Sequence, residues 1–513
     1  MSETPNIREE PRNSEVERAV DAGKNEDQTI LVEAPPPSPS LLPNKLELVW
    51  WHIFSFCSYF VLSFLVPVLF PLMITQRAWP KFDLSPPAFT TPLGVACREK
   101  EMILYQKLTH PSIAISSSKF SPLRWTTISW AVTVVLAIPI ITLTAHHLDH
   151  GNHQRSILIG AIVAGALSCL LTGFFETIWL FPFLIAIIAI SSIMGTAIQA
   201  RHLGLMVRGL TDRATGNLYF PHRRAINSWL SFNGTAAGSL GAAMIAVFSY
   251  HMLRRTDQLT SLWVVFIFSG LQWLGGITHA TLSNPGCSSP IKSNYLAKCA
   301  HMLTIFNYPH AICGLATVFL SSFACMCIFA SGVLYIIGDL CIKPLILLVL
   351  WMIYFAFPAV SLSALHPLQL IISADAVSMQ LLGFFMSAFT SGLGFYFKDE
   401  KWKQLHIILA TFLQSTANGV LHASGRAMLV DCSPEGKEGA FGMWFAWAKA
   451  VGGCAGFAVG TASPGNVRTT FAIAFLASFL GVFVLIFGNA SNARGMVAAG
   501  HVQEEENVKR SAV

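Results

Sequence analysis

Long apolar runs separated by short polar stretches occupy most of the chain. A membrane-spanning helix needs roughly 20 consecutive apolar residues, and the pattern predicts about twelve such helices. Their expected ranges are 46–75, 125–145, 156–175, 178–199, 225–250, 259–282, 311–338, 345–365, 377–397, 406–430, 439–461 and 470–487. The pattern therefore predicts an all-α integral membrane protein with about twelve transmembrane helices.

Composition supports a membrane protein. Hydrophobic residues make up 53% of the chain and charged residues only 12%, against about 25% charged in a soluble domain. The formal net charge of +6 is spread over loops, so it points to membrane interfaces and not to nucleic acid. Lys and Arg of the short loops favour a cytosolic N-terminus. Residues 1–45 are polar and rich in Pro near 35–40, which predicts a disordered tail, and 488–513 form a C-terminal tail.

An internal repeat indicates two related halves. The segment 191–195 in the fourth span aligns without gaps with 415–419 in the tenth span. Each span is followed by an acidic residue, a proline, a basic cluster and a helix rich in small residues. A repeat six spans apart predicts two pseudo-symmetric six-helix halves, 46–282 (with the long loop 76–123) and 311–487, joined by a linker at 283–310. Such halves bind substrate near the bilayer midplane and rock to alternate access.

Two loops resemble those of the major facilitator superfamily. Residues 434–442, at the mouth of a Gly-rich helix, look like the loop before span eleven in that superfamily, and 148–155 are similar to its Asp-x-x-Gly-x-x-Arg loop. The second loop departs from the pattern, since the leading Gly is absent and the basic run is mostly His. Within the superfamily, residues 434–439 are most like the fungal vacuolar amino-acid effluxers. The resemblance and the repeat imply that these loops gate the conformational change, with candidate residues Asp149, Gly151, Arg155, Asp212, Arg213, Pro434 and Lys437.

Polar side chains inside the spans are the candidates for substrate binding, because a charge there costs about 2.5–3.5 kcal/mol on insertion scales. In the tenth span Gln414, Asn418, His422 and Arg426 recur every four residues, which places them along one side of a helix. The amides would hydrogen-bond substrate and the basic groups would manage charge; the alternative is contact between helices.

Two further candidates lie in other spans. Lys449, in the middle of span eleven, could bind an anionic group such as a carboxylate, or could pair with Asp431 or Glu438. Asn233 lies inside span five, where it cannot be glycosylated, and is a further substrate-binding candidate. No well-buried carboxylate stands out as a proton carrier, so protons remain an open choice of coupling ion.

Cysteine and histidine patterns predict neither a disulfide framework nor a metal site. Most of the 11 cysteines lie in apolar runs, where Cys behaves as a small hydrophobe. The cluster at His146, His147, His150 and His153 could bind zinc or copper, but a solvated loop at the membrane interface explains it as well. We therefore expect no metal and no cofactor.

Together these features favour a secondary active transporter that moves a small organic solute, such as an amino acid or another carboxylate, across a vacuolar or plasma membrane. A transport-inactive scaffold or receptor could keep the same fold. A membrane-embedded enzyme is less favoured, because the chain has no paired His boxes and no evident nucleophile–base pair.

Overall fold

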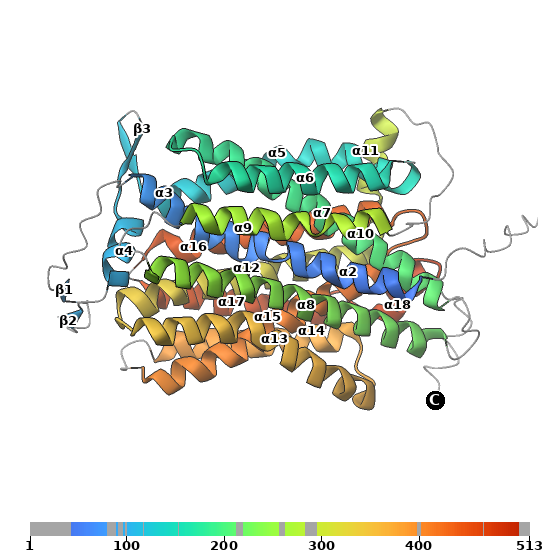
Figure 1. The fold of residues 1–513 in the computed structure, drawn as a ribbon. Coiled ribbons are helices and arrows are strands. Elements are labelled where there is room, and N and C mark those ends of the chain that lie inside the picture. The colour runs from blue at the N-terminus through green and yellow to red at the C-terminus, as the bar shows by residue number, and fades with distance from the viewer. Residues whose placement is uncertain are drawn as a thin grey trace, which may run out of the picture. The chain divides into compact units, whose positions relative to one another are not determined.

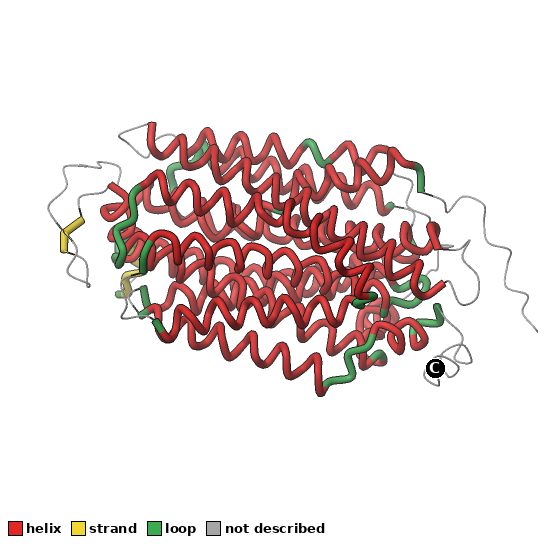
Figure 2. The backbone as a smooth tube through the Cα atoms, turned by 90° about the horizontal axis from the view of Figure 1, so that it is seen from below, coloured by secondary structure: helices red, strands yellow, loops and turns green. Residues whose placement is uncertain are grey.

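The computed structural model describes residues 43–78, 89–90, 96–97, 100–115, 117–151, 153–211, 219–255, 262–282, 295–397, 402–464 and 466–501. Nearly all of this part of the chain is helical (Figure 2). Ten of its helical segments are long and apolar enough to cross a membrane by length and composition. The chain is therefore a multi-pass, all-α membrane protein. Two further helices, α15 and α16, have sufficient length but carry the polar residues of the predicted site, so the count of twelve stays a prediction.

The first span is interrupted in the middle. Helix α2 covers Lys45–Ser58, a π-helical stretch covers Val61–Leu69, and α3 covers Phe70–Ala78. Pro67 lies inside the π-helical stretch, where its missing N–H and its ring disturb the regular i→i−4 ladder. Such stretches are frequent at functional sites, and this one carries Leu62 and Ser63 to the wall of a central cavity.

The other membrane helices follow in chain order. They are α5 Pro122–His150, α6 Gln154–Thr172, α7 Phe181–Thr211 (after a 3₁₀ turn at Ile178–Leu180), α8 Tyr219–Arg255, α9 Leu262–Leu274, α10 Ile277–Leu282, α12 Pro309–Gly338, α13 Pro344–Ile372, α14 Ala376–Tyr396, α15 Gln404–Asp431, α16 Glu438–Ala462 and α17 Val467–Phe487. Gly275 and Gly276 separate α9 from α10. Shorter helices are α11 Tyr295–Leu303 with a 3₁₀ turn at Thr304–Asn307, and α18 Asn492–Ala498.

The membrane helices run side by side (Figure 1). Helix α5 packs on α16, and α8 packs on α13 and α15, so helices from the first and second parts of the sequence share an interface. Small residues allow this close approach: a Cβ at Gly442 of α16 would lie 2.6 Å from the carbonyl oxygen of Ala197 in α7. Small residues at such contacts are typical of helix packing in membranes.

The long connection after the first span is partly ordered. It contains the strand pair β1 Phe89–Thr90 and β2 Ala96–Cys97, helix α4 Lys100–Thr109, and the strand pair β3 Ile113–Ile115 and β4 Ser118–Phe120. Both strand pairs are antiparallel. Helix α4 packs on α3, α5 and α12, so this connection bridges helices from both parts of the sequence at one end of the bundle.

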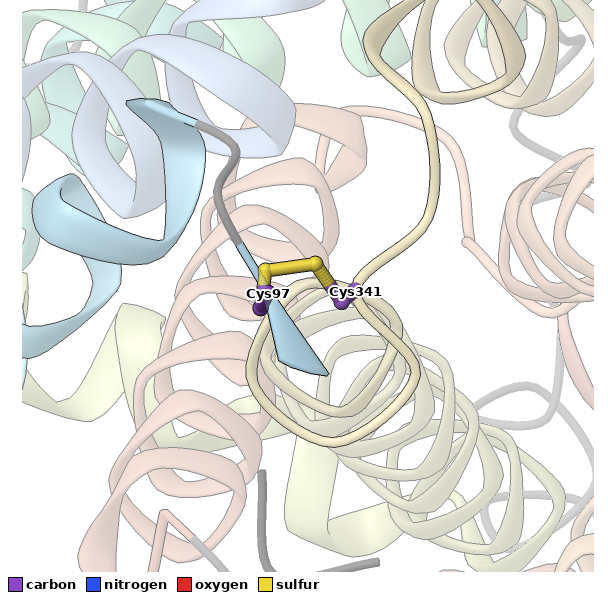
Figure 3. Close-up of a disulfide and its surroundings, with 2 residues drawn as sticks. All are labelled: Cys97 and Cys341. Atoms are coloured by element: carbon purple, nitrogen blue, oxygen red, sulfur yellow. A yellow bond between two sulfur atoms is a disulfide. The ribbon is translucent and has the colours of Figure 1, made fainter. Parts of the chain in front are cut away.

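The expectation that the cysteines form no structural disulfide is wrong. Cys97 in β2 is bonded to Cys341 in the loop between α12 and α13 (Figure 3). The two residues are 244 positions apart, and no local spacing rule could have paired them. We call this end of the bundle the disulfide end. The opposite end, where α5 and α15 finish and α16 begins, carries several buried ion pairs and is called the ion-pair end.

Candidate functional site

A central cavity lies between helices from both parts of the chain. Its walls come from the junction of α2 with the π-helical stretch, and from α5, α12, α13, α15 and α16. Its empty volume, including the space at its mouth, is ≈ 720 Å³. Aromatic rings form much of the wall, among them Tyr59, Trp130 and Phe445. No carboxylate occurs among the described residues that line it, and Lys449 is the cationic residue in the set. The cavity therefore offers one positive charge within an otherwise uncharged wall.

Lys449 is the centre of the polar side of this cavity. Its ammonium nitrogen lies 3.4 Å from Nε2 of His422 and 4.9 Å from the centroid of the Tyr59 ring. The His422 ring also packs on Tyr59, with centroids 5.2 Å apart. A lysine ammonium has only donors, so this contact uses His422 as an acceptor in its neutral form. The Lys449 ammonium keeps further donors for a bound anion.

The alternative carboxylate partners of Lys449 are engaged elsewhere. Asp431 pairs with Arg223 at 3.4 Å, and Glu438 pairs with Arg208. Both pairs lie at the ion-pair end, whereas Lys449 is halfway along α16. The proposal that Lys449 balances one of these acids therefore does not describe this structure.

The polar stripe of α15, formed by Gln414, Asn418, His422 and Arg426, lies in three different environments. Asn418 and His422 line the central cavity. Gln414, one turn away, lines a second cavity, and its Nε2 donates to Sγ of Cys325 over 3.7 Å. Arg426, at the other end of the stripe, is not among the residues that line the central cavity and is only 4% exposed. The helical period places the four side chains on one side, but only two of them share the cavity with Lys449.

Arg426 joins two helices from different parts of the sequence. Its Nε donates to Oγ of Ser231 over 3.0 Å, and its Nη2 donates to the Ser231 carbonyl and to Oγ1 of Thr235, all on α8. Its guanidinium also lies 5.1 Å from the Trp51 ring. Arg426 is thus held by neutral groups at the interface of α15 and α8. Asn233 lies two positions from Ser231, on the opposite side of α8, and does not line the central cavity.

Asp149 connects several helices at the ion-pair end. This buried carboxylate accepts hydrogen bonds from the backbone N–H groups of Gly439 and Ala440 over 2.6 and 3.0 Å, at the first turn of α16. The first N–H groups of a helix have no partner within the helix, and a carboxylate there is also favoured by the helix dipole. Asp149 further contacts Arg201 at 3.6 Å and His301 at 2.9 Å. One residue therefore ties α5 to α16, α7 and α11.

Two more buried ion pairs join the same parts of the sequence. Arg208 of α7 bonds to Glu438 of α16. Asp431 of α15 accepts from Nδ2 of Asn227 in α8 over 2.8 Å, besides its contact with Arg223. These contacts connect α7 and α8 with α15 and α16. We call α2–α10 and α12–α17 the two groups of helices; the contacts would have to break if these two groups separated at this end.

The remaining gating candidates lie in or beside this network. Gly151 ends α5 with its N–H on the carbonyl of His147, and Arg155 is exposed on α6. Pro434 lies in the turn between α15 and α16, and its carbonyl accepts from the Lys437 N–H over 3.2 Å. The Lys437 ammonium lies over the Tyr308 ring at 5.7 Å. Asp212 and Arg213 lie outside the described residues.

The histidine cluster is a set of packed rings. His146, His150 and His301 lie with ring centroids 5.1–5.6 Å apart. Over the described part of the chain, no group of three or more His, Cys, Asp or Glu side chains could hold a metal ion. The neighbouring Asp149 binds the α16 N-terminus, so these rings cover the buried carboxylate.

At the disulfide end the connection between spans one and two forms a cap, defined here as β1, β2 and α4. The Tyr105 hydroxyl of α4 donates to the Pro464 carbonyl over 3.4 Å. Its ring packs so closely on Gly338 that a Cβ there would lie 2.5 Å from it. Burial, and to a lesser extent the nearby Asp339, raises the pKa of Tyr105 to about 12. The cap therefore rests on the ends of α12 and α16 as well as on α3 and α5.

Several residues of this arrangement were missed in the sequence. Tyr59 and Tyr354 lie in long apolar runs and read there as ordinary membrane aromatics, although both line the cavity. Gln154, which accepts from Nη1 of Arg201 over 2.8 Å, was hidden in a polar loop beside the more conspicuous Arg155. Arg201 itself gave only a weak signal, because it lies two residues beyond the predicted fourth span, 178–199, whereas α7 continues to Thr211 and buries it.

No protein-family model matches the sequence, and no curated protein matches it. Solved structures do match. The human organic anion transporter MFSD10 (TETRAN) superposes with a TM-score of 0.56 at 11% identity, over 86% of this chain and 100% of that one. A bacterial homologue of the iron transporter ferroportin, in an outward-facing state, gives 0.52 at 12% identity, over 86% of this chain and 98% of that one.

At such low identity the likeness concerns the fold. The chain has the fold of major facilitator-type transporters. Both similar structures are transporters.

Proposed function

We propose that this protein is a secondary active transporter that moves a small organic anion, such as an amino acid or another carboxylate, by alternating access. The observation that carries the proposal is Lys449: a cation halfway along a buried helix, open to the central cavity, with no carboxylate among the described residues of its wall. A charge at this depth is costly unless it is paired or hydrated. A substrate carboxylate would supply the missing partner.

The aromatic wall defines the rest of the substrate. Tyr59, Trp130, Tyr354 and Phe445 offer apolar faces, and Asn418 offers a neutral amide in the same wall as Lys449. Binding sites for small organic molecules commonly combine an apolar wall with a few polar groups that fix orientation. We therefore propose a substrate with one carboxylate and an apolar body, bound head-first toward Lys449.

Alternating access would use the ion-pair end as a gate. Asp149, Glu438 and Asp431 bind partners across the interface between the two groups of helices. Opening this end requires these contacts to break together. The disulfide Cys97–Cys341 supports an orientation, since disulfides persist in oxidising compartments. We propose that the disulfide end faces the lumen or the exterior and that the ion-pair end faces the cytosol.

The proposal also covers the coupling ion and the membrane in which the protein lies. His422 and Lys449 are the adjacent titratable pair in the cavity, 3.4 Å apart, and we propose that they exchange the coupling proton. MFSD10 is an organic anion transporter, and this together with the loop likeness to fungal vacuolar amino-acid effluxers supports an anionic substrate. A vacuolar or a plasma membrane fits the proposed orientation.

Uptake into proteoliposomes tests the proposal. Purified protein is reconstituted and offered a panel of radiolabelled carboxylates and their neutral amides, with and without a pH gradient. The expected result is saturable uptake of carboxylates only. Lys449→Met should lower this uptake by about 10- to 100-fold, because a hydrogen bond to a charged group contributes about 1.5–3 kcal/mol.

The matched control is Lys403→Met, which removes an exposed lysine next to α15 at the disulfide end. It should leave uptake unchanged. Equal uptake by Lys449→Met and Lys403→Met, or equal uptake of acids and amides, would contradict the proposal of an anion site at Lys449.

A further inference from the structure

A second cavity lies beside the central one, within the group formed by α12, α13, α14, α15 and α17. Its empty volume, including the space at its mouth, is ≈ 880 Å³. Its lining includes Trp402 just before α15 and Val467 at the start of α17, so it extends toward the disulfide end. None of the described residues that line it is charged. The cavity is therefore an apolar chamber in the half of the sequence that carries Lys449.

The two cavities share a wall. Phe329 and Tyr354 line both of them, and their rings pack against each other with centroids 4.9 Å apart. A partition of two side chains can be displaced by rotation of those side chains, without movement of the helix backbones. The charged site at Lys449 and the apolar chamber are thus neighbours separated by two aromatic rings.

Two buried polar groups of the second cavity lack a partner. Oε1 of Gln414 has no hydrogen-bond donor, although the side chain is only 3% exposed, and Nε1 of Trp351 has no acceptor at 6% exposure. A buried polar atom without a partner is unfavourable and calls for an explanation. An amide group bound in this cavity would supply both complements, a donor for Gln414 and an acceptor for Trp351.

From this juxtaposition we infer that the transporter binds an amphipathic carboxylate of the N-acyl amino acid type. The carboxylate contacts Lys449 in the central cavity, the amide N–H donates to Gln414 at the partition, and the acyl chain occupies the apolar chamber beyond Phe329 and Tyr354. This inference rests on the proposed function and assigns its substrate class. Gln414 has the suitable place on α15, because it lies one turn from Asn418 and donates to Cys325 of the central wall.

The test uses N-acylglycines of increasing acyl length, from acetyl to dodecanoyl, as probes. Their binding to the full-length protein in lipid nanodiscs is measured, and the concentration of free probe is determined for each acyl length. Affinity should rise by up to about fourfold per added methylene once the chain passes the partition, the value for complete burial of that group. Gly332→Leu should abolish this rise, because Gly332 lines the second cavity and a Cβ there has no heavy atom within 4 Å.

The matched control is Gly160→Leu. Gly160 also has nothing within 4 Å of an added Cβ, but it lies exposed on α6, away from both cavities. It should bind the whole series as the wild type does. Gly332→Leu should bind N-acetylglycine with wild-type affinity, which shows that the variant is folded. The same dependence on chain length in Gly332→Leu and Gly160→Leu would overturn the inference.

A second variant tests the amide contact without filling the chamber. Gln414→Leu should weaken binding of N-octanoylglycine by about three- to tenfold, the range for one neutral hydrogen bond. It should not weaken binding of O-octanoylglycolate, in which an ester oxygen replaces the N–H. Equal effects on both probes would overturn the role of Gln414.

The results also separate this inference from the proposed function. If N-acetylglycine binds in a manner that depends on Lys449 but longer chains gain nothing, the anion site stands and the second-cavity assignment is wrong. If Lys449→Met leaves binding of N-acetylglycine unchanged, both are wrong.

Discussion

Replacing Asp149 with Asn should open the ion-pair end. The substitution preserves shape but removes the charge from a side chain that is 1% exposed and accepts from two N–H groups at the start of α16. A hydrogen bond to a charged group contributes about 1.5–3 kcal/mol, and Asn retains one acceptor oxygen for the two donors. The interaction with the helix dipole adds about 1 kcal/mol. The closed state should therefore lose about 3 kcal/mol, which is about a 150-fold change in the closed-to-open ratio.

Hydrogen–deuterium exchange in nanodiscs measures this effect. The amides of Gly439 and Ala440 have no helical partner and owe their protection to Asp149, so they should exchange faster in Asp149→Asn, together with the facing segment of α7 around Arg208. Asp375→Asn is the control, since Asp375 caps α14 by accepting from Ser378 N–H over 2.8 Å within a single helix. Equal exchange at α16 in both variants would refute the role of Asp149 as a gate.

Two further predictions concern the ends of the bundle. Cys97→Ser frees the Cys341 thiol, and a membrane-impermeant maleimide should then label it from the luminal or outer side in sealed vesicles; labelling from the cytosolic side alone would reverse the proposed orientation. At the opposite end, the ring of His501 contacts the Ser433 carbonyl at 2.8 Å, and burial, reinforced by Arg223 and Arg208, lowers the pKa of His501 to about 3. The neutral ring is thus favoured when docked, so docking of the C-terminal segment is complete above about pH 6.5 and weakens as pH falls from there toward 3. A spin label at Ala498→Cys should become more mobile between pH 7.5 and 5, and the change should vanish in His501→Gln; mobility independent of pH in the parent would contradict it.

The sequence by itself determined the class of fold. Apolar runs of sufficient length require helices in lipid, because a membrane interior leaves no other partner for backbone N–H and C=O groups. The same physics made Lys449 and the α15 stripe conspicuous, since polar groups are rare where they cost most. The repeat and loop likenesses pointed to a transporter, and the two similar solved structures share the fold of this chain and are transporters.

The tertiary structure decided what each polar residue faces. The four-residue period places Gln414, Asn418 and Arg426 on one side of α15, but the helices that cross α15 at each level differ. Gln414 therefore meets an apolar chamber, Asn418 the central cavity, and Arg426 the hydroxyl groups of α8. The disulfide of Cys97 with Cys341 likewise joins residues that are 244 positions apart, so only the tertiary structure reveals the pairing. A local pattern fixes the direction of a side chain relative to its own helix, whereas its partners come from distant segments whose positions only the packed bundle sets.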